Sequence, residues 1–166
     1  MNQKNIEYII SQLLEEMKIL DDEVLTNTPR RVANLFVNEI FTGLNNDNFP
    51  KITTFPTEKQ CLIEVDNIGV YSMCRHHLLP FFGTAKIKYI PNGKILGLSK
   101  FARIVNFYSR QPQLQEDLTS DIYSKLSELL DTKDLIVEIE AEHMCVKMRI
   151  ANSQNSKFKT IFGQII

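Results

Sequence analysis

The chain has 166 residues, a formal net charge of −1 and 43% hydrophobic residues, which fits one folded domain over residues 1–166. A near-neutral charge without a broad basic surface excludes typical nucleic-acid binding, and no apolar run of about 20 residues could span a membrane. The amino terminus lacks the apolar stretch of a secretory signal, and the three cysteines do not follow a disulfide framework. We therefore expect a reduced, cytoplasmic protein.

The first part of the chain is predicted to be helical. Apolar residues at helical spacing predict a helix over residues 6–17. Thr28 before Pro29 is typical of a helix N-cap followed by proline at the first helical position, and Gly43 should end this second helix. Residues 1–45 are thus expected to form an N-terminal helical segment.

The rest of the chain combines strands and helices. In chain order, the patterns predict a strand at 62–73 interrupted at Asp66-Asn67, a strand at 81–90, helices at 99–108 and 113–130, and strands at 135–141 and 145–150. Ser99 is a possible cap of the third helix. Two strands, two helices and two further strands indicate an α+β domain with antiparallel pairing, whose core we place at residues 60–150.

All three histidines lie in two short clusters with two of the three cysteines: Cys74-Arg75-His76-His77 and His143-Met144-Cys145. A cysteine and a histidine three positions apart can reach one ion from a tight bend. Adjacent His76 and His77 face opposite sides of an extended segment, so we expect one to bind the ion and the other to face a pocket. The same alternation would place His143 and Cys145 on one face of a strand.

Thiolate sulfur and imidazole nitrogen are preferred zinc donors, so the two clusters predict a zinc site. Three protein ligands with water in the fourth position form a catalytic zinc site, in which the pKa of the water falls to about 7. Two alternatives are a closed structural zinc with four protein ligands, and histidines with no ligand role. Paired C-x-x-C motifs, which structural zinc sites favour, do not occur in the sequence. The clusters alone do not name a substrate.

Several motifs, in the same order along the chain, resemble the GTP cyclohydrolase I family. They are TPRRVA at 28–33, NEIFxGL at 38–44, NFPKIT at 48–53, CxHHL at 74–78, PFxG at 80–83, GLSKxxRIV at 97–105, QxQExLT at 113–119 and HxCxxxR at 143–149. The similarity runs from about residue 6 to about residue 150, which is most of the chain.

This resemblance implies a tunnelling fold (T-fold), an antiparallel sheet with two long helices packed on it. Family members assemble into rings, commonly a decamer of two stacked pentameric rings, with active sites between subunits. The implied reaction converts GTP and water to 7,8-dihydroneopterin triphosphate and formate, the first step of folate and pterin biosynthesis. A homo-oligomer with GTP as substrate is therefore expected.

By matching positions, the resemblance also implies roles for the clustered residues. Cys74, His77 and Cys145 would hold Zn²⁺, which leaves His76 and His143 as free imidazoles. Because an imidazole exchanges protons near neutral pH, His143 would act as the acid at the purine ring nitrogen. His76 would help to move protons at the sugar or the leaving amine.

Substrate-binding roles follow from the same resemblance. Glu116, supported by Gln115, would accept hydrogen bonds from the guanine ring and its exocyclic amine, an edge that adenine does not offer. Residues matching the family's triphosphate-binding positions are Ser99, Lys100, Arg103, Arg149 and Arg31.

The chain also departs from the family pattern at three positions near these motifs. Arg75 stands where the family usually has glutamate, Asp117 where it usually has arginine, and Ile150 where it usually has glycine. Arg75 and Asp117 carry opposite charges and could form a compensating pair. These departures motivate one alternative function, a non-catalytic GTP-binding or regulatory relative. A further alternative is a T-fold enzyme acting on another purine or pterin.

Overall fold

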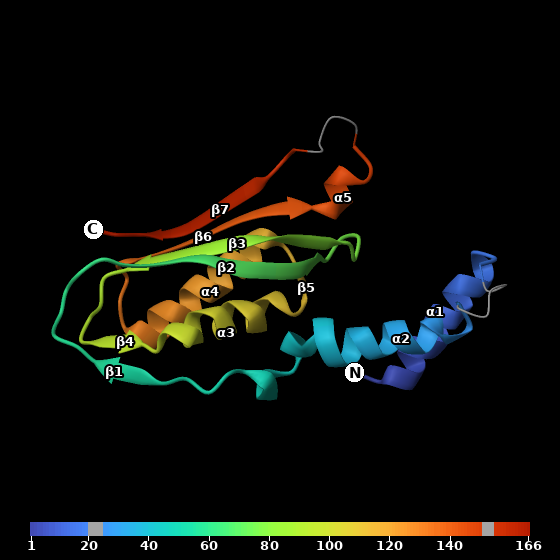
Figure 1. The fold of residues 1–166 in the computed structure, drawn as a ribbon, viewed down its shortest axis with the longest axis horizontal. Coiled ribbons are helices and arrows are strands. Elements are labelled where there is room, and N and C mark those ends of the chain that lie inside the picture. The colour runs from blue at the N-terminus through green and yellow to red at the C-terminus, as the bar shows by residue number, and fades with distance from the viewer. Residues whose placement is uncertain (20–24, 151–154) are drawn as a thin grey trace.

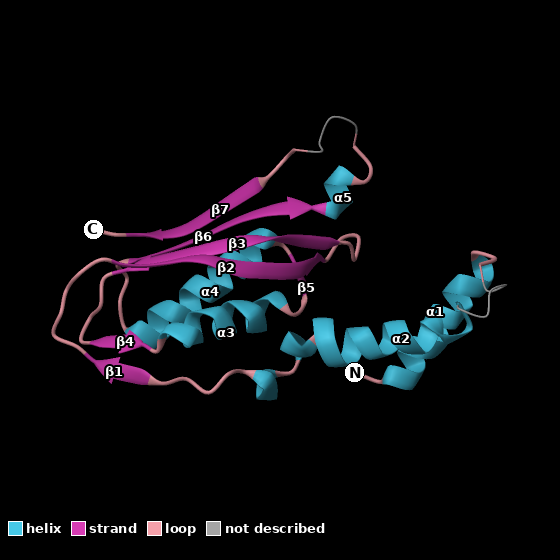
Figure 2. Cartoon of the chain, viewed as in Figure 1, coloured by secondary structure: helices cyan, strands magenta, loops and turns pink. Residues whose placement is uncertain are grey.

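The computed structural model describes residues 1–19, 25–150 and 155–166. Its α-helices are α1 (Gln3–Glu16), α2 (Thr28–Leu35), α3 (Leu98–Ser109), α4 (Gln115–Leu130) and α5 (Met144–Lys147). Its strands are β1 (Thr54–Pro56), β2 (Ile63–Cys74), β3 (Pro80–Tyr89), β4 (Lys94–Leu96), β5 (Pro112–Gln113), β6 (Leu135–His143) and β7 (Phe158–Gln164). Helices α3 and α4 cover one face of the main sheet, which confirms the predicted α+β class (Figures 1 and 2).

The main sheet has five strands in the order β5-β2-β3-β6-β7. All neighbours are antiparallel except β5, which pairs in parallel with the end of β2. The predicted interruption in the first long strand is a β-bulge between Val65 and Ile68, where Asn67 adopts a φ of 56°. Strands β1 and β4 form a separate two-stranded sheet.

Alternation along β6 separates the two faces of this sheet. Its odd-numbered residues from Leu135 to Ala141 are buried beneath the helices. Its even-numbered residues face the open side, where Glu138 pairs with Lys159 of β7 and Glu140 pairs with Lys157 just before β7. Because β7 pairs with β6, Phe158, Thr160 and Phe162 lie opposite buried residues and share the helix side. The period of two thus fixes which side chains reach a site on that side.

Two predicted helix starts differ from the structure. Thr28 is the first residue of α2 and Asn27 precedes it as the cap, with no capping hydrogen bond from its side chain. Proline still occupies the first helical turn, because its missing N–H is not needed there. Helix α3 starts at Leu98 after Gly97, so Ser99 lies in the first turn rather than at the cap.

The segment predicted as a strand at 145–150 is instead helical. Strand β3 begins at Pro80, and its last pair with β6 joins Phe81 to His143. Beyond His143 neither neighbour of β6 continues, since β7 pairs with it only as far as Ala141. The backbone therefore forms its hydrogen bonds locally, including Met148 N to Met144 O at 3.0 Å. The final strand of the sheet is β7, which the sequence patterns did not predict.

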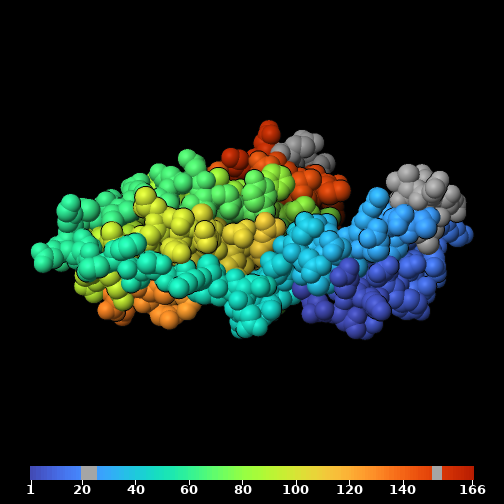
Figure 3. All heavy atoms as spheres, turned by 60° about the horizontal axis from the view of Figure 1, so that its bottom comes forward, coloured from blue at the N-terminus to red at the C-terminus, as the bar shows by residue number. Residues whose placement is uncertain are grey.

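The N-terminal helices pack against each other and extend beyond the end of the sheet (Figure 1). The segment between α2 and β1, turquoise in Figure 3, then crosses over α3. In this segment, the ring of Phe49 packs edge-on against that of Phe107 in α3, with ring centroids 5.0 Å apart. In the described part of the chain, no helix is both long and apolar enough to cross a bilayer.

Candidate metal centre and active-site cavity

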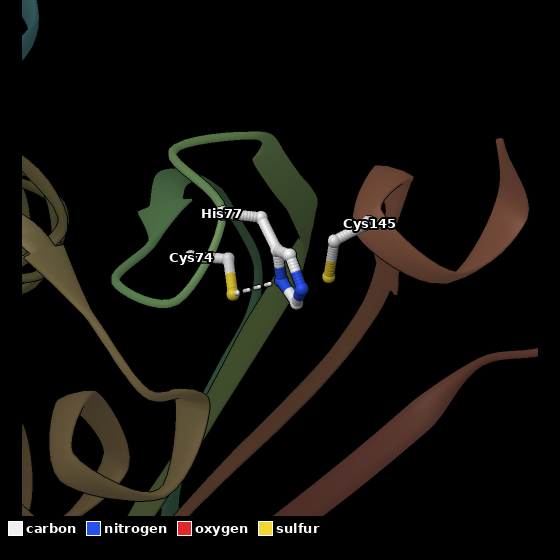
Figure 4. A group of neighbouring side chains, drawn as sticks. All are labelled: Cys74, His77 and Cys145. Atoms are coloured by element: carbon white, nitrogen blue, oxygen red, sulfur yellow. Dashed lines mark hydrogen bonds between the residues drawn. The ribbon is translucent and has the colours of Figure 1, made fainter. Parts of the chain in front are cut away.

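A tight hairpin loop between β2 and β3 brings Cys74 and His77 together. Cys74 N donates to Leu79 O at 2.9 Å, and Leu78 N donates to Cys74 O at 2.8 Å. Leu78 adopts a φ of 50°, a left-handed conformation that non-glycine residues rarely adopt. The bend places Cys74 Sγ 3.9 Å from His77 Nδ1 (Figure 4).

The third member of the cluster comes from the helical turn after β6. The Cys145 sulfur approaches the other two donors, and all three donor atoms lie within 4.8 Å of one another (Figure 4). In a tetrahedral zinc site with Zn–S distances of about 2.3 Å, donors lie about 3.5–3.8 Å apart. The cluster therefore fits a thiophilic divalent ion with only small adjustment. The strand predicted to present Cys145 is wrong, but the meeting with Cys74 is confirmed.

Both cysteines of the cluster are buried. Cys74 and Cys145 are each 6% exposed, whereas His77 is exposed. Burial raises the pKa of the Cys145 thiol, and the adjacent Cys74 adds to this effect. A bound cation reverses such a balance, because it stabilises the deprotonated sulfurs. The chemistry of the donor set thus matches a metal centre.

His143 lies next to this cluster and is held between two phenylalanines. Because His143 pairs with Phe81 across β6 and β3, the rings stack with centroids 4.7 Å apart and an angle of 8°. Phe158 of β7 meets the imidazole edge-on at 5.2 Å. Burial lowers the pKa of His143, and the nearby Glu116 carboxylate acts in the opposite direction.

Gln115, which is only 3% exposed, holds the Nε2 nitrogen of His143 in place. Its amide nitrogen faces Ile139 O and Phe158 O, each at 3.0 Å, and the Thr160 hydroxyl at 3.1 Å. The amide oxygen is thereby left to accept a hydrogen bond from His143 Nε2 at 2.8 Å. This arrangement selects the tautomer with hydrogen on Nε2, so Nδ1 is the acceptor when the ring is neutral.

A cavity of about 390 Å³ joins these groups at one end of the sheet. Residues singled out from the sequence that line it are Cys74, His76, His77, Gln115, Glu116, His143 and Cys145. Phe158, Lys159 and Thr160 of β7 also line the cavity, and sequence reasoning missed them. The alternation of Phe158, Thr160 and Phe162 was the signal for a strand with one face toward the helices.

The cations expected to bind a triphosphate are not gathered at this cavity. Ser99 and Lys100 lie at the start of α3, which is at the opposite end of the helix layer (Figure 1), and Arg103 lies near the middle of this helix. Lys100 Nζ donates to Lys51 O at 2.8 Å. Arg31 lies exposed on α2.

Arg149 is the exception among these cations. Its Nε donates to Cys145 O at 2.9 Å, which places its guanidinium beside the backbone of a cluster residue. The described part of a single chain therefore provides the metal cluster, His76, His143 and Glu116. Of the four expected cations, it places Arg149 next to this group.

The expected compensating pair is present. Arg75 Nη1 donates to Asp117 Oδ2 at 3.2 Å, and both side chains are about half exposed. Arg75 N also donates to Gln113 O at 3.2 Å. The loop that carries His76 and His77 is thus joined to the start of α4, where Glu116 lies.

Comparison with known proteins identifies the family of the chain. The GTP cyclohydrolase I family model matches residues 3–164. The chain is 44% identical over 164 residues to the GTP cyclohydrolase 1 of Shewanella sp. (strain ANA-3), covering 96% of this chain and 76% of that protein. It is 43% identical over 164 residues to that of Shewanella putrefaciens (strain CN-32 / ATCC BAA-453), covering 96% and 77% respectively.

Among solved structures, the archaeosine synthase QueF-Like in the apo form matches with a TM-score of 0.54 and 17% identity, covering 64% of this chain and 96% of that chain. This likeness concerns the fold, and it identifies the antiparallel sheet with its two helices as a T-fold. Within this class, the family match and the high identity to named enzymes decide the assignment. The chain belongs to the GTP cyclohydrolase I family of hydrolases.

Proposed function

We propose that the chain converts GTP and water to 7,8-dihydroneopterin triphosphate and formate, with zinc held by Cys74, His77 and Cys145. The observation that carries this proposal is one cavity that combines three clustered soft donors, two further imidazoles and a carboxylate. When bound, zinc would supply Lewis-acid activation of water for attack on the purine's five-membered ring. The other steps rest on the chain's own side chains.

His143 is proposed as the acid that, in its imidazolium form, donates the Nδ1 proton to the ring nitrogen as water adds to the carbon between the two nitrogens, while Nε2–H stays bonded to Gln115. Its neighbours support this role, because Gln115 holds Nε2 and the phenylalanines fix the plane of the ring. Hydrogen-bonded and packed in this way, the ring has little freedom to turn away from substrate. Positioned proton donors of this kind contribute about 10²–10⁴-fold to rate.

His76 and Glu116 are proposed to act on other parts of GTP. Exposed His76 lines the same cavity as His143 and would move protons at the sugar or the leaving amine. Glu116, in the first turn of α4, would accept hydrogen bonds from the guanine ring N–H and the exocyclic amine. Adenine offers no such donor pair, so the carboxylate would be left unpaired with ATP.

We further propose a homo-oligomer, a decamer of two stacked pentameric rings, in which the start of α3 from one subunit reaches the cavity of its neighbour. The separation of Ser99, Lys100 and Arg103 from the cavity supports this arrangement. Strand β7 also lies at the edge of the sheet with Ile161 and Phe162 exposed. An unpaired edge with apolar side chains is suited to pairing with another copy.

The direct test is incubation of the purified full chain with GTP, with and without a zinc chelator, followed by mass identification of products. We expect formate and 7,8-dihydroneopterin triphosphate from GTP, loss of both with chelator, and recovery when zinc is added. GTP binding without formate would instead identify a non-catalytic relative. A formamide product, or turnover of another purine in preference to GTP, would identify a different T-fold enzyme.

A further inference from the structure

Phe158 is an aromatic residue in the cavity wall that none of the proposed steps uses. It begins β7 opposite Ala141, so its side chain lies on the helix side of the sheet. Its ring meets His143 at 5.2 Å and an angle of 81°, yet 43% of the residue remains exposed. An exposed apolar ring thus stands directly beside the proposed acid.

The position of this ring is set by a well-anchored backbone. Gln115 Nε2 donates to Phe158 O at 3.0 Å, and the pairing with Ala141 continues the β6–β7 ladder. Phe81, the other ring against His143, is fully buried and offers no surface to a ligand. Among the described residues that line the cavity, Phe158 is the phenylalanine with surface free to contact a substrate.

We propose that Phe158 forms the wall against which the guanine ring packs, and so contributes directly to GTP binding. This inference rests on the proposed function. A purine bonded along one edge by Glu116 and approached by His143 still has apolar faces that must leave water. Aromatic side chains stack on nucleobases without distinguishing their hydrogen-bonding edges, so Phe158 would add affinity while Glu116 adds specificity.

The test compares Phe158→Ala, Phe158→Leu and Phe158→Tyr with wild type in steady-state GTP turnover. Loss of base stacking typically weakens binding by about 5- to 150-fold, so we expect Phe158→Ala to raise KM for GTP at least about fivefold. Its kcat should stay within about threefold of wild type. Phe158→Tyr should retain KM within about twofold, with Phe158→Leu between the two.

Tyr71→Ala is the control, because Tyr71 is an exposed aromatic residue of β2 on the face of the sheet opposite the helices and does not line the cavity. It should leave KM unchanged. An unchanged KM in Phe158→Ala, or a fall in kcat alone, would overturn the inference, since the ring would then act only on His143. If wild type shows no turnover, the proposed function fails, and GTP titration of wild type and Phe158→Ala still decides whether the ring binds the base.

Discussion

Gln115 shows how one buried amide can organise a proton-transfer group. Its nitrogen points to backbone and hydroxyl acceptors of β6 and β7, and its oxygen faces His143 Nε2. We infer that its principal task is to position His143, with any contact to guanine secondary. A histidine held through one nitrogen presents the other in a defined protonation state, as general acid–base chemistry requires.

This role predicts different effects for two substitutions of Gln115. Gln115→Ala should lower kcat by about 10- to 100-fold, because the imidazole loses its partner while the metal ligands remain. Gln115→Glu keeps an acceptor for Nε2 and adds a negative charge, which raises the pKa of His143. Its pH–rate profile should therefore move to higher pH. Full kcat in Gln115→Ala across the pH range would contradict the positioning role.

At the scale of secondary-structure elements, the β2–β3 hairpin loop is linked to the first turn of α4. The Arg75–Asp117 ion pair joins the hairpin loop to this helix. Both side chains are about half exposed, so the pair contributes at most about 1 kcal/mol. Asp117 also lies in the first turn of α4, where the helix dipole favours a negative charge.

Charge reversal at the pair gives a double-mutant test. Arg75→Asp and Asp117→Arg should each lower kcat/KM by about two- to fivefold, since like charges would separate the loop from the helix. The combined swap should recover to within about twofold of wild type. Glu128→Lys, which breaks the Lys125–Glu128 pair on the same helix at its exposed member, is the control and should have no effect. If kcat/KM of the double variant is no higher than that of the worse single variant, the ion pair does not position the loop against the helix.

The long strands and helices were predictable from the sequence, because the periodicity of their apolar residues can be seen without knowing which elements they pack against. The strands at 62–73 and 81–90 and the helix at 113–130 correspond to β2, β3 and α4 with shifts of at most two residues at their ends. Strands β1, β4 and β5 are only two or three residues long and exist through their pairing, which no local pattern encodes. The segment after His143 alternates like a strand, but the pairing of β6 with β3 ends at Phe81 and His143.

The site itself was more predictable than the secondary structure around it. Reduced cysteines and every histidine in two clusters pointed to one centre, and Cys74, His77 and Cys145 do meet. Phe158 escaped notice because apolar residues in an edge strand resemble ordinary packing residues. The mutual contacts of Gln115, Phe158 and His143 depend on strand register, which the sequence does not state.

At the scale of the whole molecule, the residues proposed for catalysis lie far from most of the residues proposed to bind the triphosphate. The cavity lies at the end of β2 and β6, whereas Lys100 lies at the start of α3, at the opposite end of the helix layer, and Arg103 lies near the middle of α3 (Figure 1). A ring that repeats this unit head to tail would bring the two ends together at each interface. Activity would then require assembly.

This division predicts complementation between two inactive variants. His143→Ala and the double variant Lys100→Ala/Arg103→Ala should each be nearly inactive alone. Co-expressed at equal amounts in mixed rings, they should regain about a quarter of wild-type formate release, because one site in four combines two intact halves. A mixture no more active than its components would place the triphosphate site within a single subunit.

The most direct measurement is formate release from GTP by zinc-loaded His143→Ala, with zinc content determined on the same sample. We expect zinc to remain at one ion per chain, because Cys74, His77 and Cys145 are untouched, and formate release to fall by at least about 100-fold. Wild-type formate release from a zinc-loaded His143→Ala chain would contradict the assignment of this imidazole as the acid.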